Sequence, residues 1–122
     1  HYASVEEKLA RAGGRILGLL LPKWLLGEMA EKAQDEKETT KTRLIKKEDG
    51  LLDLNKPAEE NLRKVLAYST WPTAYMLYKN KVGKELRVVV KDAELNDGKF
   101  VPLRVIPAGK REMSWQDFLR GN

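Results

Sequence analysis

The stretch that decides the fold of this 122-residue chain runs from residue 74 to residue 106, AYMLYKNKVGKELRVVVKDAELNDGKFVPLRVI. Apolar and polar side chains alternate in it with a period of two, which is typical of half-buried β-strands. The alternation predicts three strands, at residues 74–79, 86–93 and 99–106. A turn containing Gly83 separates the first two, and Asn96-Asp97-Gly98 is a strong hairpin signal between the last two. We therefore expect an antiparallel meander.

Helices are expected on both sides of this meander. Ser4 and Glu7 have the spacing of a capping box. An amphipathic helix should follow, because apolar residues recur at intervals of three and four: Val5, Leu9, Ala12, Ile16 and Leu20. Pro22 is expected to end that helix and to open a second, shorter one. The second helix would place four residues on one face: Trp24, Leu25, Met29 and Lys32.

The middle of the chain is polar and charge-rich from residue 34 to residue 47, which predicts an extended crossing with a short strand around residues 42–45. Lys47-Glu48-Asp49-Gly50 should form a turn, in which Gly50 is able to take a positive φ. Asn55 is expected to cap a helix that continues to about Ser69. Its buried face would be made by Leu62, Val65 and Leu66.

The end of the chain predicts a last short helix capped by Ser114. Four apolar side chains of this tail should pack onto the strands: Met113, Trp115, Phe118 and Leu119. The combination of helices and an antiparallel meander makes the expected class α+β.

Composition excludes several kinds of site. The chain has no cysteine, so it has neither disulfides nor thiolate metal ligands. The longest apolar run, residues 16–21, is far shorter than the roughly 20 residues that span a bilayer. The only histidine, His1, is the first residue and is better explained as a tag remnant than as a ligand. Because no Ser-His-Asp set, metal-ligand spacing or phosphate-binding glycine loop is present, the sequence predicts no catalytic centre.

The positive charge of the chain indicates instead a polyanion as a binding partner. The net charge is +5, and residues 71–122 carry 10 basic and 6 acidic side chains, a net of +4. In the strand 86–93 basic residues alternate with valines, so one face of the sheet could be basic while the other is buried. Such a face suits phosphate contacts to structured RNA, and it equally suits an ordinary solvated surface. The candidate RNA-binding residues are Lys79, Lys81, Lys84, Arg87, Lys91, Arg104, Lys110 and Arg111.

The chain resembles the C-terminal portion of methionyl-tRNA formyltransferases in four segments that occur in the family's order. One is the tail at residues 109–121, GKREMSWQDFLRG, and the ordered combination of the four is far more specific than any one of them. The other three are Lys8-Leu9-Ala10 with Leu19-Leu20-Leu21-Pro22, Lys46-Lys47-Glu48-Asp49-Gly50-Leu51-Leu52-Asp53 preceded by Gln34-Asp35-Glu36 and Thr40, and Trp71-Pro72-Thr73-Ala74-Tyr75. The resemblance covers nearly the whole chain.

The resemblance implies a division of labour. The family transfers a formyl group from 10-formyltetrahydrofolate to initiator methionyl-tRNA in the cytoplasm. Its catalytic Asn, His and Asp lie upstream of every segment matched here, so this chain is expected to hold no catalytic residue and no cofactor. The resemblance implies that residues 1–54 are the end of an α/β catalytic domain with its linker. Residues 55–69 would then be a linker helix, and residues 70–122 a small OB-like β-barrel or meander that binds tRNA.

Two other interpretations stay open at this point. The chain could be the scaffold region of a related formyltransferase that acts on a sugar or small molecule and binds no RNA. It could also self-associate, since helices that pack against a missing catalytic domain would expose an apolar face.

Overall fold

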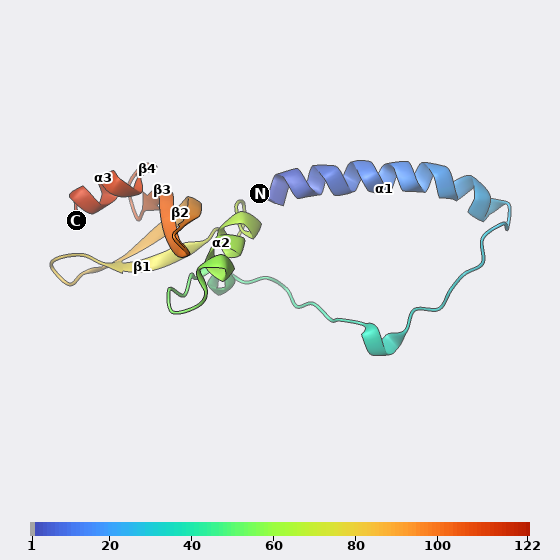
Figure 1. Cartoon of the computed structure of the whole chain (residues 1–122), viewed down its shortest axis with the longest axis horizontal. Helices are drawn as coiled ribbons and strands as arrows, with labels where there is room; N and C mark the ends of the chain where they lie inside the picture. The colour runs from blue at the N-terminus through green and yellow to red at the C-terminus, as the bar shows by residue number, and fades with distance from the viewer. Residues whose placement is uncertain (1) are drawn as a thin grey trace. The chain divides into compact units, whose positions relative to one another are not determined.

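The computed structural model describes residues 2–122, so His1 lies outside the described residues. The chain divides into two compact units, Ala3–Leu44 and Ile45–Asn122, and each is described by itself. The second unit contains α2 (Ala58–Ala67), β1 (Tyr75–Lys79), β2 (Glu85–Asn96), β3 (Lys99–Pro107), β4 (Met113–Ser114) and α3 (Trp115–Arg120) (Figure 1). Helices and an antiparallel sheet together confirm the α+β class.

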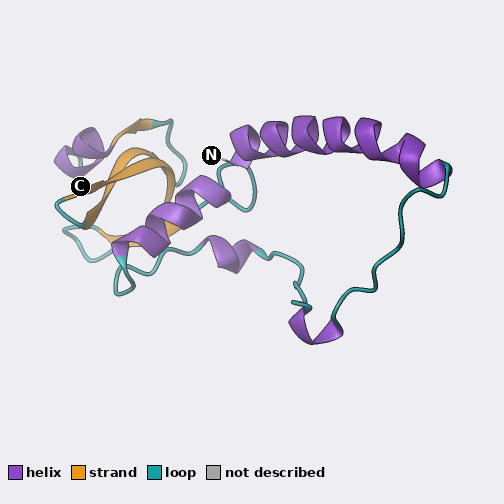
Figure 2. Cartoon of the chain, turned by 45° about the vertical axis from the view of Figure 1, so that its right-hand side comes forward, coloured by secondary structure: helices purple, strands orange, loops and turns teal. Residues whose placement is uncertain are grey.

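The sheet is a meander in the order β1-β2-β3-β4, with every neighbouring pair antiparallel. All three predicted strands are present, and the predicted tight turn is confirmed, since Asp97 and Gly98 have φ values of 50° and 72° between the paired residues Asn96 and Lys99. The register of β2 and β3 shifts between Val90 and Ala93, which is the mark of a β-bulge. The strands curve strongly, as Figure 2 shows, with α2 and α3 packed beside them.

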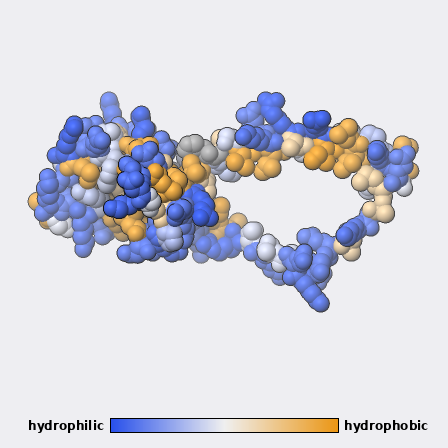
Figure 3. All heavy atoms as spheres, viewed as in Figure 1, coloured by the Kyte–Doolittle hydropathy of each residue, from blue (hydrophilic) through white to orange (hydrophobic). Residues whose placement is uncertain are grey.

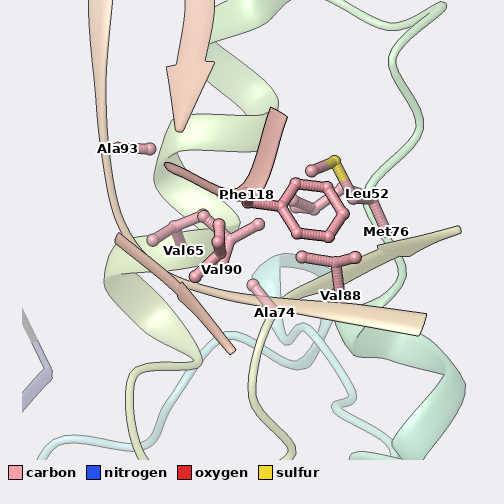
Figure 4. Close-up of a cluster of buried hydrophobic side chains, with 9 residues drawn as sticks. Leu52, Val65, Ala74, Met76, Val88, Val90, Ala93 and Phe118 are labelled. Atoms are coloured by element: carbon pink, nitrogen blue, oxygen red, sulfur yellow. The ribbon is translucent and has the colours of Figure 1, made fainter. Parts of the chain in front are cut away.

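The core lies on the concave side of this sheet (Figure 4) and also takes in residues from α2, α3 and the segment before α2. It consists of Leu52, Val65, Ala74, Met76, Val88, Val90, Ala93, Val105 and Phe118. A cluster of aromatic rings packs the tail onto the sheet. The Tyr78 and Phe118 rings meet edge to face with their centroids 4.9 Å apart, and the Trp115 ring stacks on Phe118 with a centroid distance of 5.2 Å. The predicted packing of the tail is therefore confirmed for three residues, whereas Leu119 is 40% exposed because it lies on the outer side of α3.

Of the two predicted helix caps, the one at Ser114 is confirmed and the one at Asn55 is wrong. Ser114 caps α3 as predicted, since its Oγ accepts a hydrogen bond from the Asp117 N–H at 3.1 Å. Asn55 does not cap α2: its side chain donates to Asp53 Oδ1, and Pro57 occupies the cap position. The helix ends at Ala67 and buries Val65, while Leu62 and Leu66 are half-buried. A second residue of α2 is buried, Asn61, which is 2% exposed and which no sequence pattern predicted.

The predicted turn at residues 47–50 is confirmed as a 3₁₀ turn, η2 (Lys47–Gly50). Gly50 does not use the positive φ that is open to a glycine. A side chain is excluded there by space, because a Cβ on Gly50 would lie 2.1 Å from the backbone oxygen of Thr73. Thr73 has a φ of 69° and follows Pro72, whose peptide bond with Trp71 is cis. The turn before α2 therefore packs directly on the backbone that leads into β1.

The first unit differs from the sequence prediction in two ways. A single helix, α1 (Tyr2–Leu25), runs through Pro22, and the second short helix is absent. Pro22 removes only one backbone hydrogen bond, and the Leu26 N–H donates to the Pro22 oxygen at 3.1 Å. The helix ends in a Schellman motif, in which Gly27 has a φ of 73° and Glu28 N–H donates to Lys23 O at 3.0 Å.

The strand expected at residues 42–45 is also absent, since no described segment pairs with it and an unpaired strand leaves its backbone groups unsatisfied. The stretch is loop, and the nearest regular structure is a 3₁₀ turn, η1 (Glu36–Glu38). Apolar side chains gather along one side of α1 (Figure 3), and the apolar residues predicted for that helix are exposed in this structure.

Candidate nucleic-acid interface

The turn between β1 and β2 carries three lysines. Asn80 shapes this turn, because its N–H donates to the Lys84 oxygen at 3.0 Å and its Oδ1 accepts from the Lys84 N–H at 2.8 Å. Lys79, Lys81 and Lys84 are all exposed, and none of them forms a salt bridge with another described residue. Glu85 is the one carboxylate of this hairpin and lies opposite Lys79 in the ladder, so residues 79–85 carry a net charge of +2.

The turn between β3 and β4 brings further basic residues to the same end of the sheet. Pro107 pairs with Val88, and the following Ala108 N–H donates to the Arg87 oxygen at 2.9 Å. The turn thus starts beside Arg87. Lys110 closes it by donating its N–H to the Pro107 oxygen at 3.0 Å, and both Lys110 and the next residue, Arg111, are exposed.

The end of α3 adds a residue that the sequence reasoning missed. Arg120 lines a shallow hollow together with Lys81 and Val82 of the hairpin tip. Its partner is Asp117, at 3.3 Å, but both side chains are more than half exposed, so this pair stabilises by less than about 1 kcal/mol. No local pattern marks Arg120, because only the packing of the tail brings it beside the hairpin.

Six cations therefore gather at one end of the sheet, from the β1–β2 hairpin, β2, the β3–β4 turn and α3. We call this set the basic end: Lys79, Lys81, Lys84, Arg87, Lys110 and Arg120. Arg111 follows Lys110 in the same exposed turn. Charges that converge from separate segments make a site for a polyanion, because their fields add at one place.

Two of the predicted RNA-binding residues, Lys91 and Arg104, lie away from the basic end and form hydrogen bonds within the protein. Lys91 is four residues along β2 from Arg87, roughly 13 Å away at the rise of a strand, and its Nζ donates to the Ser69 oxygen at 3.3 Å. Arg104 lies opposite Asp92 and its Nε donates to Glu112 Oε1. The structure does not bring these two side chains to the basic end.

The expected alternation in β2 is confirmed in a weaker form, because on its outer face Val89 and Lys91 are half-buried and only Arg87 of these three is exposed. Val88 and Val90 are 0% and 3% exposed, whereas Arg87 projects from the other face. On that face the guanidinium carbon of Arg87 lies 3.9 Å from the centre of the Tyr75 ring, within the range of a cation–π interaction.

Between residues 2 and 122, no group of three His, Cys, Asp or Glu side chains is placed to hold a metal ion. Within the same range, no helix has the length and apolar character needed to cross a membrane. The Glu60 carboxylate accepts a hydrogen bond from Lys56 Nζ at 2.9 Å and raises the pKa of Lys56, which stays charged at neutral pH.

The chain is similar to a known protein family and to several named enzymes. Residues 44–102 match the family described as formyl transferase, C-terminal domain. The methionyl-tRNA formyltransferase of Myxococcus xanthus is 31% identical over 137 residues, which cover 98% of this chain and 44% of that protein. The enzyme of the same name from Chloroflexus aurantiacus is 36% identical over 102 residues, covering 84% of this chain and 32% of that protein. The enzyme of that name from Bacillus licheniformis is 30% identical over 138 residues, which cover 97% of this chain and 44% of that protein.

The chain thus spans less than half the length of these curated relatives, and it aligns with them over most of its own residues. This chain therefore belongs to the formyl transferase family and corresponds to the C-terminal portion of methionyl-tRNA formyltransferases.

Proposed function

We propose that this chain is the RNA-binding part of a methionyl-tRNA formyltransferase and that its basic end binds the phosphate backbone of initiator tRNA. The observation that carries the proposal is the gathering of Lys79, Lys81, Lys84, Arg87, Lys110 and Arg120 from four segments. Folded RNA presents closely spaced phosphates in a fixed shape, and proteins recognise such RNA largely through its shape and backbone. A fixed cluster of exposed cations fits that kind of partner.

The formyl-transfer chemistry would then belong to a segment that precedes this chain in the whole protein. In this proposal 10-formyltetrahydrofolate binds there, residues 1–54 complete that catalytic domain, and residues 55–69 link it to a reduced OB-like domain at residues 70–122. The whole protein would act in the cytoplasm, where translation starts. Titration of this chain with a reduced folate, followed by tryptophan fluorescence, should show no binding; saturable binding would contradict this division.

The apolar side of α1 fits the same proposal. Leu9 and Ile16 are 66% and 54% exposed on it, and the relatives extend well beyond the aligned part. We propose that the preceding catalytic domain covers this side in the whole protein. Without that domain, the chain is expected to associate with itself through α1.

The binding experiment removes the hairpin lysines together, as Lys79→Ala, Lys81→Ala and Lys84→Ala in one variant. Binding to fluorescently labelled initiator tRNA at physiological salt should weaken by at least about tenfold, because three phosphate contacts and their released counterions are lost. The matched control carries Lys37→Ala, Lys41→Ala and Lys99→Ala, which removes the same charge from exposed positions outside the basic end. The control should bind nearly as well as the unchanged chain.

Equal loss in the two variants would mean that net charge, and not the basic end, governs binding. Absence of tRNA binding by the unchanged chain would favour the alternative of a scaffold in a formyltransferase that acts on a small molecule. Competition with a duplex RNA of similar length adds a second test, since initiator tRNA should compete better than the duplex if its folded shape is recognised.

A further inference from the structure

We propose that Arg87 and Tyr75 form a stacking platform for one unpaired base of the bound RNA. The proposal rests on the proposed function, because it assumes that the chain binds RNA, and it adds a second kind of contact to the phosphate contacts of the basic end. Unpaired bases are commonly stacked on aromatic rings or on the planes of arginine guanidinium groups.

The two side chains lie on adjacent strands in a diagonal pair. Tyr75 is opposite Val89 and Arg87 is opposite Leu77, so Arg87 is one position removed from Tyr75 on the same face of the sheet. The guanidinium carbon lies 3.9 Å from the centre of the Tyr75 ring. The guanidinium therefore lies against the ring, and because Arg87 is exposed, solvent or a ligand can still reach this group.

The backbone holds this pair in place from both directions. The Tyr75 oxygen accepts a hydrogen bond from the Leu52 N–H at 2.8 Å, and the Arg87 oxygen accepts one from the Ala108 N–H at 2.9 Å. Both residues also belong to the β1–β2 ladder. A platform that is ordered before binding costs less conformational entropy when a base is added.

The surroundings favour a base next to a phosphate backbone. Arg87 is exposed and forms no ion pair with another described residue, so its charge is available. Leu77, half exposed, borders the pair with an apolar surface that a base can cover. Side chains alternate along β1, so Lys79 projects from the same face as Tyr75 and Leu77. The face thus leads from an apolar and cationic platform to the lysines of the hairpin.

The experiment uses a uridine RNA about eight nucleotides long, within the site size of a small RNA-binding domain, that carries a single 2-aminopurine. Stacking of this base quenches its fluorescence, and titration with the full chain gives the affinity. The unchanged chain should quench the signal. Arg87→Lys keeps the charge but removes the plane, and Tyr75→Leu keeps an apolar side chain but removes the ring. Each should weaken binding by about tenfold, the scale of one lost base stack, and abolish the quenching.

Two comparisons separate this proposal from the proposed function. Binding of a duplex RNA of the same length should change by less than about twofold in Arg87→Lys, since a duplex offers phosphates but no free base. Arg63→Lys is the matched control, because Arg63 is an exposed arginine of α2 outside the basic end, with no ring contact to another described residue, and it should leave binding of both RNAs unaffected.

Unchanged quenching in folded Arg87→Lys and Tyr75→Leu proteins would overturn the platform while leaving phosphate binding intact. If the unchanged chain binds initiator tRNA but not the single-stranded RNA, the platform alone is overturned. If it does not bind initiator tRNA either, both proposals are overturned. Circular dichroism of each variant confirms that the sheet is folded, and Tyr75→Phe, which retains the ring, should restore both the affinity and the quenching.

Discussion

Gly50 shows how a single hydrogen atom in place of a side chain permits a tertiary contact. A Cβ at this position would overlap the Thr73 oxygen, at 2.1 Å, and that oxygen belongs to backbone that cannot move independently of β1. Gly50→Ala should therefore lower the free energy of unfolding of the second unit by about 1–3 kcal/mol, as overpacked interiors do. Urea unfolding followed by near-ultraviolet circular dichroism of the Tyr78 ring cluster measures this change.

The control for Gly50 is Gly13→Ala, because nothing lies within 4 Å of a Cβ built on Gly13 and the residue belongs to the other unit. It should leave the unfolding of the second unit unchanged. Equal stability of Gly50→Ala and the unchanged chain would mean that the η2 turn does not pack on Thr73 as described.

Asn61 ties the segment before α2 to the helix. Its side chain is 2% exposed, accepts from the Asp53 N–H at 3.1 Å and donates to the Asp53 oxygen at 2.8 Å. Asn61→Ala removes both bonds and leaves two backbone groups without partners, so it should cost about 1–3 kcal/mol in the same unfolding experiment. Asn55→Ala is the control, since Asn55 is exposed and its side chain bonds only to Asp53 Oδ1. If both variants lost equal stability, the bridge from Asn61 would not be the cause.

At the scale of elements, local signals predicted what local interactions determine. The period of two and the Asn-Asp-Gly turn predicted β2 and β3 to within a few residues, because both depend on neighbouring residues alone. Pro22 misled the prediction, because a proline near the end of a helix costs only one hydrogen bond, while the actual stop is Gly27.

Long-range contacts account for what the sequence could not predict. The position of Arg120 depends on the tail packing against Tyr78, some 40 residues earlier, and the burial of Asn61 depends on the path of the chain around Asp53. The hairpin lysines were found in the sequence because they are close together in it. The sequence did not predict that Lys110 lies at the same end of the sheet. That position depends on the hydrogen bond from the Ala108 N–H to the Arg87 oxygen, which exists only in the folded sheet.

The apolar side of α1 carries a prediction of its own. Leu9→Gln together with Ile16→Gln should abolish self-association of the chain, because polar side chains remove the apolar surface that would be buried. Sedimentation velocity over a range of concentrations gives the measurement. Lys8→Gln with Arg15→Gln, on the charged side of the same helix, is the matched control and should associate like the unchanged chain. A chain that is monomeric at every concentration would contradict exposure of this side.

At the scale of the whole molecule, tRNA binding and formyl transfer would lie in different parts of one protein. The described chain supplies a sheet with a cationic end, and the relatives continue over a stretch that this chain does not contain. Electrostatic binding of this kind has a clear signature, because each phosphate contact releases counterions and makes affinity fall with salt.

The salt dependence of initiator tRNA binding tests this claim most directly. A plot of log affinity against log salt concentration should have a slope of roughly −4 to −5 if all six cations of the basic end contact phosphates, at about 0.7–0.9 per contact. The Lys79, Lys81 and Lys84 triple variant should have a slope smaller in magnitude by roughly 2 to 3. A slope near zero, or the same slope in the triple variant, would contradict the assignment of tRNA binding to the basic end.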